Sequence, residues 1–242
     1  ARMNQKTVLV TSNFDNVGSL PCNTSIGGPA KGIIVREIDA LGGQMPKTAD
    51  KTYLQMKMLN TAKGPGVQSL RAQADKKVYP RYMQEVLKKQ ENLDIIEGMV
   101  EDLIVEDNCV KGVILDNGQT IEGRMVILTT GTYLKAEILC GDQKHASGPD
   151  QQKESKYLSE KLANLGMRIQ RLKTGTPPRV EINSVDYSKT SLQPGTDANL
   201  AFSYQTNEFI PIEEQTPCYL TYTNEKTHQI IRDNLHRSSM YS

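Results

Sequence analysis

Short apolar runs alternate with amphipathic stretches along the first ninety residues. Residues 7–11, Thr-Val-Leu-Val-Thr, are apolar and β-branched, which predicts a buried strand. Apolar positions at helical spacing predict a helix over 31–41, and the glycine pair that follows would end it. Similar spacing predicts a short helix over 53–60 and a longer one over 68–90, which Pro80 is expected to kink or split.

The pattern changes after residue 92. Residues 93–96 predict another strand, and the runs beyond them, separated by Asp-Asn and Asp-Asn-Gly turns, predict a three-stranded meander. After residue 173 the chain becomes rich in loops. The further elements predicted are meander strands over 99–105, 110–115 and 120–121, a fully buried strand over 125–128, and helices over 155–165 and 224–235.

The order of these elements indicates an α/β fold. A parallel sheet that receives a meander and then a buried strand ending in Thr129-Thr130-Gly131 is typical of dinucleotide-binding domains of the flavoprotein type. Such domains begin with a strand and a Gly-x-Gly-x-x-Gly turn, and no such sequence occurs in the chain. We therefore interpret residues 7–11 as the second strand of a domain that lacks its first βαβ unit.

Composition narrows the function classes. The 242 residues carry 24% charged and 37% hydrophobic side chains and a formal net charge of +1, so the chain as a whole favours neither nucleic acid nor membrane. The four cysteines form no Cys-x-x-Cys pair, which argues against a metal site or a disulfide framework and suits a reducing cytoplasm. No apolar run approaches the roughly 20 residues of a membrane span, and no signal-peptide pattern opens the chain.

Charge is nevertheless uneven along the sequence. Residues 47–91 carry ten lysines and arginines against four acidic residues. A basic face of this size suits phosphate groups. An ordinary solvated helix surface would have the same composition.

The strongest chemical signal is the loop at 21–32, which precedes the first predicted helix. Around Asn23, Gly27 and Gly28 the backbone N–H groups can approach a flat or anionic ligand, and the helix start adds a positive dipole end. Cys22 would then stand at the edge of the site as a nucleophile. The alternative is an unreactive packing cysteine before an ordinary glycine turn.

Several longer strings point to one family. They are Cys22-Asn23-x-x-Ile26-Gly27-Gly28, Glu37-Ile38-Asp39-Ala40-Leu41-Gly42-Gly43, Arg171-Leu172-Lys173-Thr174-Gly175-Thr176-Pro177-Pro178-Arg179 and Thr223-Asn224-Glu225-Lys226-Thr227-His228. In this order they resemble the large FAD-binding subunit of the bacterial tRNA uridine 5-carboxymethylaminomethyl modification enzyme, the MnmG/GidA family. The resemblance covers essentially the whole chain and identifies it as an internal fragment.

The resemblance implies how the chain is organised. Residues 1–175 would form a partial FAD-binding, Rossmann-like domain of the glutathione-reductase type, with the meander at 98–123. Residues 176–242 would begin an inserted α+β domain associated with nicotinamide and tRNA. Family members extend further at both ends, so the glycine fingerprint and a second cysteine motif are expected to lie outside this sequence.

The resemblance also implies an activity. With a partner GTPase, the enzyme would add a carboxymethylaminomethyl-type group to C5 of the wobble uridine of tRNA, using FAD, with NADH and methylenetetrahydrofolate as co-substrates. The setting would be a cytoplasmic homodimer that joins the GTPase in a heterotetramer, and the isolated fragment is expected to be inactive. Two alternatives remain: an inactive module that only binds tRNA or the partner, and a folate- and FAD-dependent tRNA uridine methyltransferase.

Family roles can be carried over to individual residues. The resemblance gives Cys22 a catalytic role. It places the main chain of Val100 against the adenine of FAD and gives Ser155 a second cofactor contact. The remaining cofactor-binding candidates are Thr11, Asn23, Gly27, Gly28, Thr130 and Gly131, and the candidates for phosphate or nucleic acid are Arg171, Lys173 and Arg179.

Each of these positions also has a simpler interpretation. Val100 could be an ordinary meander residue, and Ser155 could be a helix N-cap. The Thr130-Gly131 pair could be a tight turn, and the basic string could be a charged surface turn.

Overall fold

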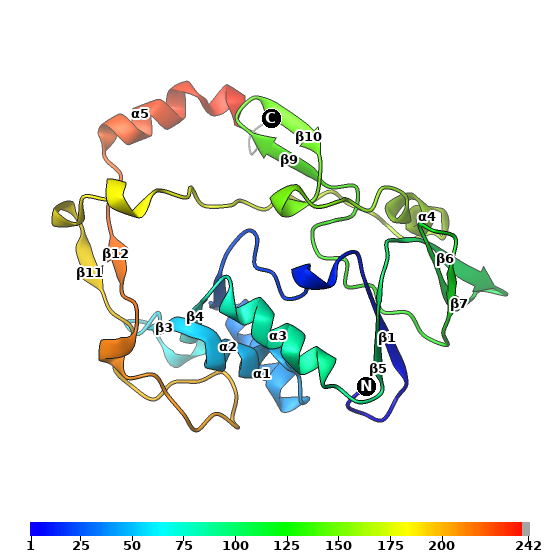
Figure 1. Cartoon of the computed structure of the whole chain (residues 1–242). Helices are drawn as coiled ribbons and strands as arrows, with labels where there is room; N and C mark the ends of the chain where they lie inside the picture. The colour runs from blue at the N-terminus through cyan, green and yellow to red at the C-terminus, as the bar shows by residue number, and fades with distance from the viewer. Residues whose placement is uncertain (239–242) are drawn as a thin grey trace. The chain divides into compact units, whose positions relative to one another are not determined.

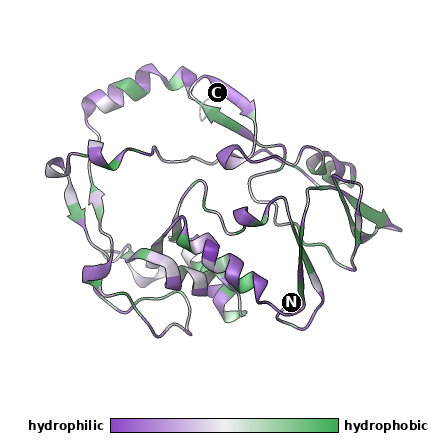
Figure 2. Cartoon of the chain, viewed as in Figure 1, coloured by the Kyte–Doolittle hydropathy of each residue, from purple (hydrophilic) through white to green (hydrophobic). Residues whose placement is uncertain are grey.

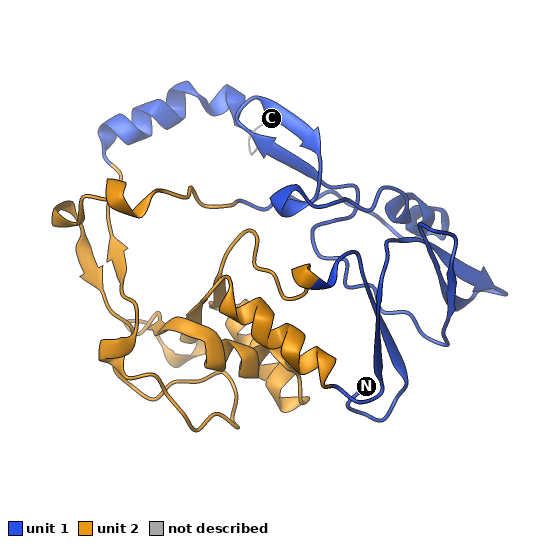
Figure 3. Cartoon of the chain, viewed as in Figure 1, with its two compact units in different colours: residues 1–14, 90–175, 224–242 blue, residues 15–89, 176–223 orange. Residues whose placement is uncertain are grey.

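The computed structural model describes residues 1–238 as a mixed α/β protein (Figure 1). Contacts within the chain divide it into two compact units, and each is discontinuous in sequence (Figure 3). Unit 1 comprises residues 1–14, 90–175 and 224–242, and unit 2 comprises 15–89 and 176–223. The boundary that the resemblance implies at residue 175 refers to the family's FAD-binding and inserted domains, and it stays a prediction.

Unit 2 is built on an antiparallel sheet with strand order β2-β4-β3. Three helices belong to the same unit, and α1 and α2 contact each other and β4. The bounds are β2 (Ser25–Gly27), β3 (Tyr53–Leu59), β4 (Ser69–Ala74), α1 (Lys31–Ala40), α2 (Met45–Thr52) and α3 (Val78–Lys88). One face of each helix and strand contributes to a continuous core of Ile26, Val35, Ala49, Tyr53, Met56, Leu70, Ala72, Ala74, Tyr79 and Phe202.

The segment around Phe202 is fixed to this core by two buried carboxylates. Asp50 of α2 accepts hydrogen bonds from the backbone N–H groups of Phe202 and Ser203, both at 2.8 Å, and from the Thr206 hydroxyl at 2.7 Å. Asp39 of α1 accepts one from the N–H of Tyr204 at 2.9 Å. A segment remote in sequence therefore completes the core of unit 2.

Strand β3 also contacts a small antiparallel strand pair made of β11 (Ser191–Gln193) and β12 (Cys218–Leu220). The buried Gln55 amide donates to the carbonyl oxygen of Gln193 at 2.9 Å, and its oxygen accepts from the Cys218 thiol at 3.4 Å. Residues from the second half of the chain thus pack beside those from the first.

Unit 1 contains three separate small sheets. Strands β1 (Thr7–Thr11) and β5 (Leu93–Glu97) pair in parallel, and Figure 2 shows β1 largely in the hydrophobic colour. Strands β6, β7 and β8 form the antiparallel meander, and β9 pairs with β10. The bounds are β6 (Val100–Glu106), β7 (Cys109–Leu115), β8 (Thr120–Glu122), β9 (Glu137–Cys140), β10 (Gln143–Ala146), α4 (Leu158–Asn164) and α5 (Glu225–Asp233).

The sequence predictions for β1, α1, β5, the meander and α5 are confirmed as elements, as is the mixed α/β class. The burial expected for residues 7–11 is not observed, because β1 has no buried residue and Val8 is 39% exposed. Asn224 caps α5, because its side chain accepts a hydrogen bond from the N–H of Thr227 at 3.0 Å. Gly42, with φ of +81°, ends α1 as expected.

The helix predicted over 53–60 is wrong, because these residues form β3. A register shift between Tyr53 and Gln55 interrupts the in–out alternation, so the apolar pattern does not have the regular period of a strand. The sequence pattern does not predict helix α2, which lies just before β3. Its apolar content is low, and Pro46 occupies its first turn, where a missing N–H is tolerated.

The long helix predicted over 68–90 is also wrong in its first half. Leu70, Ala72 and Ala74 are buried at a spacing of two residues and belong to β4. Helix α3 starts only at Val78, so Pro80 lies in its first turn and removes no helical hydrogen bond.

Two predictions in unit 1 need correction. The buried strand expected over 125–128 does not form, and Met125 and Ile127 are 88% and 85% exposed. In the described structure the sheet formed by β1 and β5 has two strands, and residues 125–128 do not pair with it. The helix expected from residue 155 starts only at Leu158, and the residue at its cap position is Tyr157, so Ser155 is not an N-cap.

Candidate functional site: the cysteine loop and the start of the meander

Cys22 lies in unit 2, in the loop just before β2, and its side chain is partly buried. The Asn23 side chain accepts a hydrogen bond from the N–H of Ser25 at 2.7 Å, which forms a tight turn directly after the cysteine. The Thr24 carbonyl accepts from the N–H of Ala74 at 2.9 Å. The loop is thus anchored to the end of β4.

The two glycines of the loop have different roles. Gly27 has φ of +131°, and a Cβ there would lie 2.1 Å from the Leu70 carbonyl oxygen, so strand packing itself requires glycine. Gly28 has φ of +99°, and a Cβ added there would meet no other atom within 4 Å. Its N–H donates to the Leu70 carbonyl at 2.9 Å. The Lys31 ammonium donates to the Ser25 carbonyl at 3.2 Å, and burial lowers the pKa of this ammonium.

A segment from the second half of the chain reaches the same loop within unit 2. The Thr176 hydroxyl donates to Cys22 Sγ at 3.3 Å, and the Arg179 guanidinium donates to the Pro21 carbonyl at 3.3 Å. Of the three predicted basic candidates, Arg179 therefore lies at the cysteine loop. Thr176 was not singled out from the sequence, although it stands in the basic string that was.

In unit 1 the structure brings together two predicted cofactor contacts. The Ser155 hydroxyl donates to the carbonyl oxygen of Val100, the first residue of β6, at 3.4 Å. The N–H of Ser155 donates to the Tyr133 carbonyl at 2.9 Å, and the Ser155 carbonyl accepts from the N–H of Lys135 at 2.7 Å. Ser155, 5% exposed, is therefore held from both sides.

A cavity of about 550 Å³ opens beside this point in unit 1. Met99 and Glu101, the neighbours of Val100, line it with Asp116 and with residues from 146 to 157. Main-chain and side-chain polar groups thus surround a space next to the start of β6.

The other predicted cofactor residues of unit 1 lie in turns. Thr11 ends β1, and its hydroxyl donates to the Asn13 carbonyl at 3.2 Å. Gly131 has φ of +58°, and the Thr130 carbonyl accepts from the N–H of Tyr133 at 3.3 Å. The tight turn is therefore present, although the strand expected before it is not.

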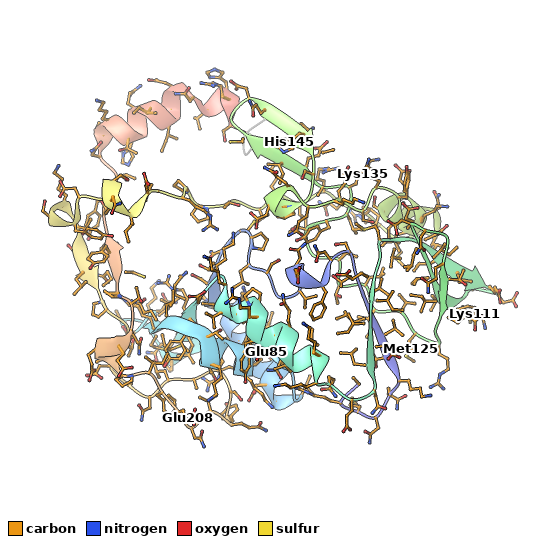
Figure 4. All side chains as sticks on the ribbon, viewed as in Figure 1. Glu85, Lys111, Met125, Lys135, His145 and Glu208 are labelled. Carbon is orange, nitrogen blue, oxygen red and sulfur yellow. The ribbon has the colours of Figure 1, made fainter. Side chains whose placement is uncertain are left out.

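The rest of the basic string belongs to unit 1. The Arg171 guanidinium donates to the Lys135 carbonyl at 3.2 Å and lies 3.8 Å from the Glu137 carboxylate. Figure 4 labels Lys135, whose ammonium pairs with Glu160 at 2.6 Å. Lys173 is exposed. The structure thus assigns Arg171 and Lys173 to one unit and Arg179 to the other.

These features define a class of protein: a mixed α/β protein with a cysteine-bearing glycine loop in one unit and a parallel strand pair with a meander in the other. Residues 1–242 match the family described as "Glucose inhibited division protein A", and the chain belongs to this family.

Individual relatives agree with this family. The chain is 56% identical to the "tRNA uridine 5-carboxymethylaminomethyl modification enzyme MnmG" of Geobacillus kaustophilus (strain HTA426) over all 242 residues, which are 38% of that protein. It is 54% identical to the protein of the same name from Bacillus thuringiensis (strain Al Hakam), again over 38% of its length. The chain therefore spans less than two fifths of these relatives.

A solved structure shows the same fold. The structure of Aquifex aeolicus GidA in its form I crystal matches the whole chain with a TM-score of 0.93 and 45% sequence identity, and the match covers 41% of that chain. The form II crystal matches 98% of this chain and 40% of that one, with a TM-score of 0.90.

In residues 1–238, no helix is long and apolar enough to cross a membrane.

Proposed function

We propose that this chain is part of an enzyme that modifies the wobble uridine of tRNA with the help of FAD. The observation that carries the proposal is the unbroken match of all 242 residues to relatives named tRNA uridine 5-carboxymethylaminomethyl modification enzyme. The match spans the whole chain, and with it the segments that contain the cysteine loop and the basic string.

FAD fits the polar groups at the start of β6. The Val100 main chain, held by Ser155 at 3.4 Å, offers a strand edge of the kind that recognises a base. The adjoining cavity of about 550 Å³ is in the size range of cofactor sites. When bound, FAD would supply the redox chemistry. In this proposal the Val100 main chain binds the adenine part, Ser155 makes a second contact with FAD, and Thr11, Thr130 and Gly131 complete the cofactor surface.

Cys22 is the proposed catalytic residue. Its thiolate would add to the base or protect a reactive intermediate, as its place in a glycine loop with open space at Gly28 allows. Asn23 and Gly27 shape this loop. Arg171, Lys173 and Arg179 are proposed to contact phosphate groups.

The proposal extends to the setting of the reaction. The group added to C5 of uridine is of the carboxymethylaminomethyl type, with NADH and methylenetetrahydrofolate as co-substrates. The enzyme acts in the cytoplasm as a homodimer together with a partner GTPase. These assignments rest on the family.

Flavin binding tests the proposal directly. The 242-residue chain is mixed with FAD and desalted, and the visible flavin absorbance is recorded. We expect retained flavin, and we expect Ser155→Ala to weaken it, whereas the exposed Ser191→Ala in unit 2 should not. A colourless chain that still bound tRNA would instead favour a binding module without cofactor chemistry.

A further inference from the structure

We propose that Thr176 is a positioning residue for Cys22, and that its hydroxyl stabilises the thiolate form of the cysteine. The proposal rests on the function proposed above, in which Cys22 acts as a thiolate. It adds a residue that prepares the cysteine without touching the substrate.

The direction of the hydrogen bond carries the argument. Thr176 Oγ1 lies 3.3 Å from Cys22 Sγ, within hydrogen-bonding distance, and toward a thiolate, which carries no proton, the hydroxyl is necessarily the donor. A donor directed at a sulfur atom interacts more strongly with the negative thiolate than with the neutral thiol. Removing this donor should therefore make the thiolate harder to form.

A second cysteine in the same unit has the opposite arrangement. The Cys218 thiol donates to Gln55 Oε1 at 3.4 Å, and the Gln55 amide is itself fixed by the Gln193 carbonyl. A contact in which the sulfur must supply the proton favours the neutral thiol. Cys218 thus serves as an internal reference for Cys22.

The position of the Thr176 hydroxyl is restrained by the residues that follow it. Three residues further on, Arg179 donates to the Pro21 carbonyl at 3.3 Å, so the segment meets the loop at two points. Pro177 and Pro178 lie between these points, and their rings fix the backbone φ angles. The segment therefore has little freedom to carry the hydroxyl away from the sulfur.

The cysteine loop is equally well anchored on its other side. The Ser25 hydroxyl donates to Gln73 Oε1 at 2.7 Å, and the Gln73 amide donates to the Thr24 hydroxyl. Gln73 belongs to β4, in the middle of the sheet of unit 2. Both partners of the Thr176–Cys22 contact are thus held by structure within one unit.

The test measures how fast each cysteine is alkylated by iodoacetamide as a function of pH, with peptides resolved by mass spectrometry. Thr176→Val removes the hydroxyl but keeps the shape. We expect the midpoint for Cys22 to move to higher pH, so that alkylation below the midpoint slows by about three- to tenfold. The profile of Cys218 should not change.

Two further variants make the test specific. Thr176→Ser keeps a hydroxyl and should restore the midpoint, and Thr216→Val, an exposed threonine elsewhere in unit 2, should leave it unchanged. If Thr176→Val only loosened the cysteine loop, the alkylation rate of Cys22 at high pH would change, but the pH midpoint of its alkylation would not. An unshifted midpoint in Thr176→Val, or no rescue by Thr176→Ser, would overturn the proposal.

These outcomes are separate from enzymatic activity. If Cys22→Ser left tRNA modification by the full-length enzyme intact, the catalytic role proposed for Cys22 would fail. The alkylation midpoint of Cys22 would still report whether Thr176 stabilises its thiolate.

Discussion

The two units differ sharply in how they bury their apolar residues. Unit 2 has a continuous core of ten buried residues contributed by its sheet, its helices and the segment around Phe202. In the described part of unit 1, the buried hydrophobic residues are Val113, Leu115, Leu158 and Leu162. Large exposed apolar side chains occur in both units, such as Ile127 at 85% and Met125, labelled in Figure 4, in unit 1 and Leu41 at 89% in unit 2.

This difference teaches that an apolar run needs a partner before it becomes a buried element. Strands β3 and β4 are paired, and helices cover them, so their apolar residues are buried. In unit 1 the pair β1–β5 stands as a two-stranded sheet, and such sheets are marginal in water. We expect unit 2 to resist unfolding better than unit 1, and the following experiments test that comparison.

The largest effect is expected from Phe202→Ala in unit 2. Phe202 is fully buried, and truncating such a ring lowers the free energy of unfolding by about 3–5 kcal/mol. Urea unfolding followed by circular dichroism would measure the loss. Phe209→Ala, at a partly buried position of the same unit, should have a smaller effect. Equal losses in the two variants would contradict the assignment of Phe202 to the core.

Leu158→Ala makes the matching test in unit 1. Leu158 is 2% exposed, but it is one of only four buried hydrophobic residues in the described part of unit 1, so we expect a loss of about 2–3 kcal/mol, at the lower end of such substitutions. Amide hydrogen exchange should accelerate in the meander and α4 while α1 and α2 stay protected. Uniform acceleration over both units would mean that they unfold together, and the comparison would break down. Leu165→Ala, at a 46% exposed site, is the control.

Asp50→Asn tests the attachment of the Phe202 segment. The carboxylate accepts three hydrogen bonds, and an amide would turn an NH₂ group toward a donor, which we expect to lower the free energy of unfolding by about 1–3 kcal/mol. Thermal unfolding would measure this, with the exposed Asp197→Asn as control. An unchanged stability would show that the segment does not depend on this carboxylate.

Asp75→Ala should have a smaller, pH-dependent effect. Asp75 accepts from the N–H groups of Lys77 at 2.7 Å and Val78 at 2.9 Å, where α3 begins, and a lost cap lowers stability by about 1 kcal/mol. These bonds hold the pKa of Asp75 below its usual value of 3.8. The stabilisation is therefore complete above that pH and is lost as the pH falls through the lower, folded-state value.

Urea unfolding of the parent and of Asp75→Ala across this pH range would check the expectation. The two stabilities should differ at neutral pH and converge in acid. A difference that stayed constant into acid would argue against the charged carboxylate as the cap.

The smallest effect is expected for Arg237→Gln in unit 1. Its guanidinium pairs with both carboxylate oxygens of Asp142, at 3.1 and 2.6 Å, but both side chains are more than half exposed. Such pairs contribute little and are screened by salt. Thermal unfolding should detect at most a small shift at low ionic strength and none at high salt. A large shift would show that unit 1 depends on surface charge rather than on its core.

The same contrast explains which predictions succeeded. Thr7–Thr11 and Leu93–Glu97 are short β-branched or apolar runs with turn residues around them, and the meander has its own turn signals. Such local signals are enough to predict a strand. The site was less predictable, because the close approach of Gly27 to Leu70 and the contact between Thr176 and Cys22, 154 positions apart, both depend on residues remote in sequence.

By itself, the sequence determined the α/β class, the meander, the positions of α1 and α5, and the family through its ordered motifs. Only the tertiary structure decided that residues 53–59 and 69–74 are paired strands, that 125–128 is exposed, and that the basic string is divided between two units. The physical reason is that local preferences of a few residues are weak, whereas burial and strand pairing depend on partners far away in the chain.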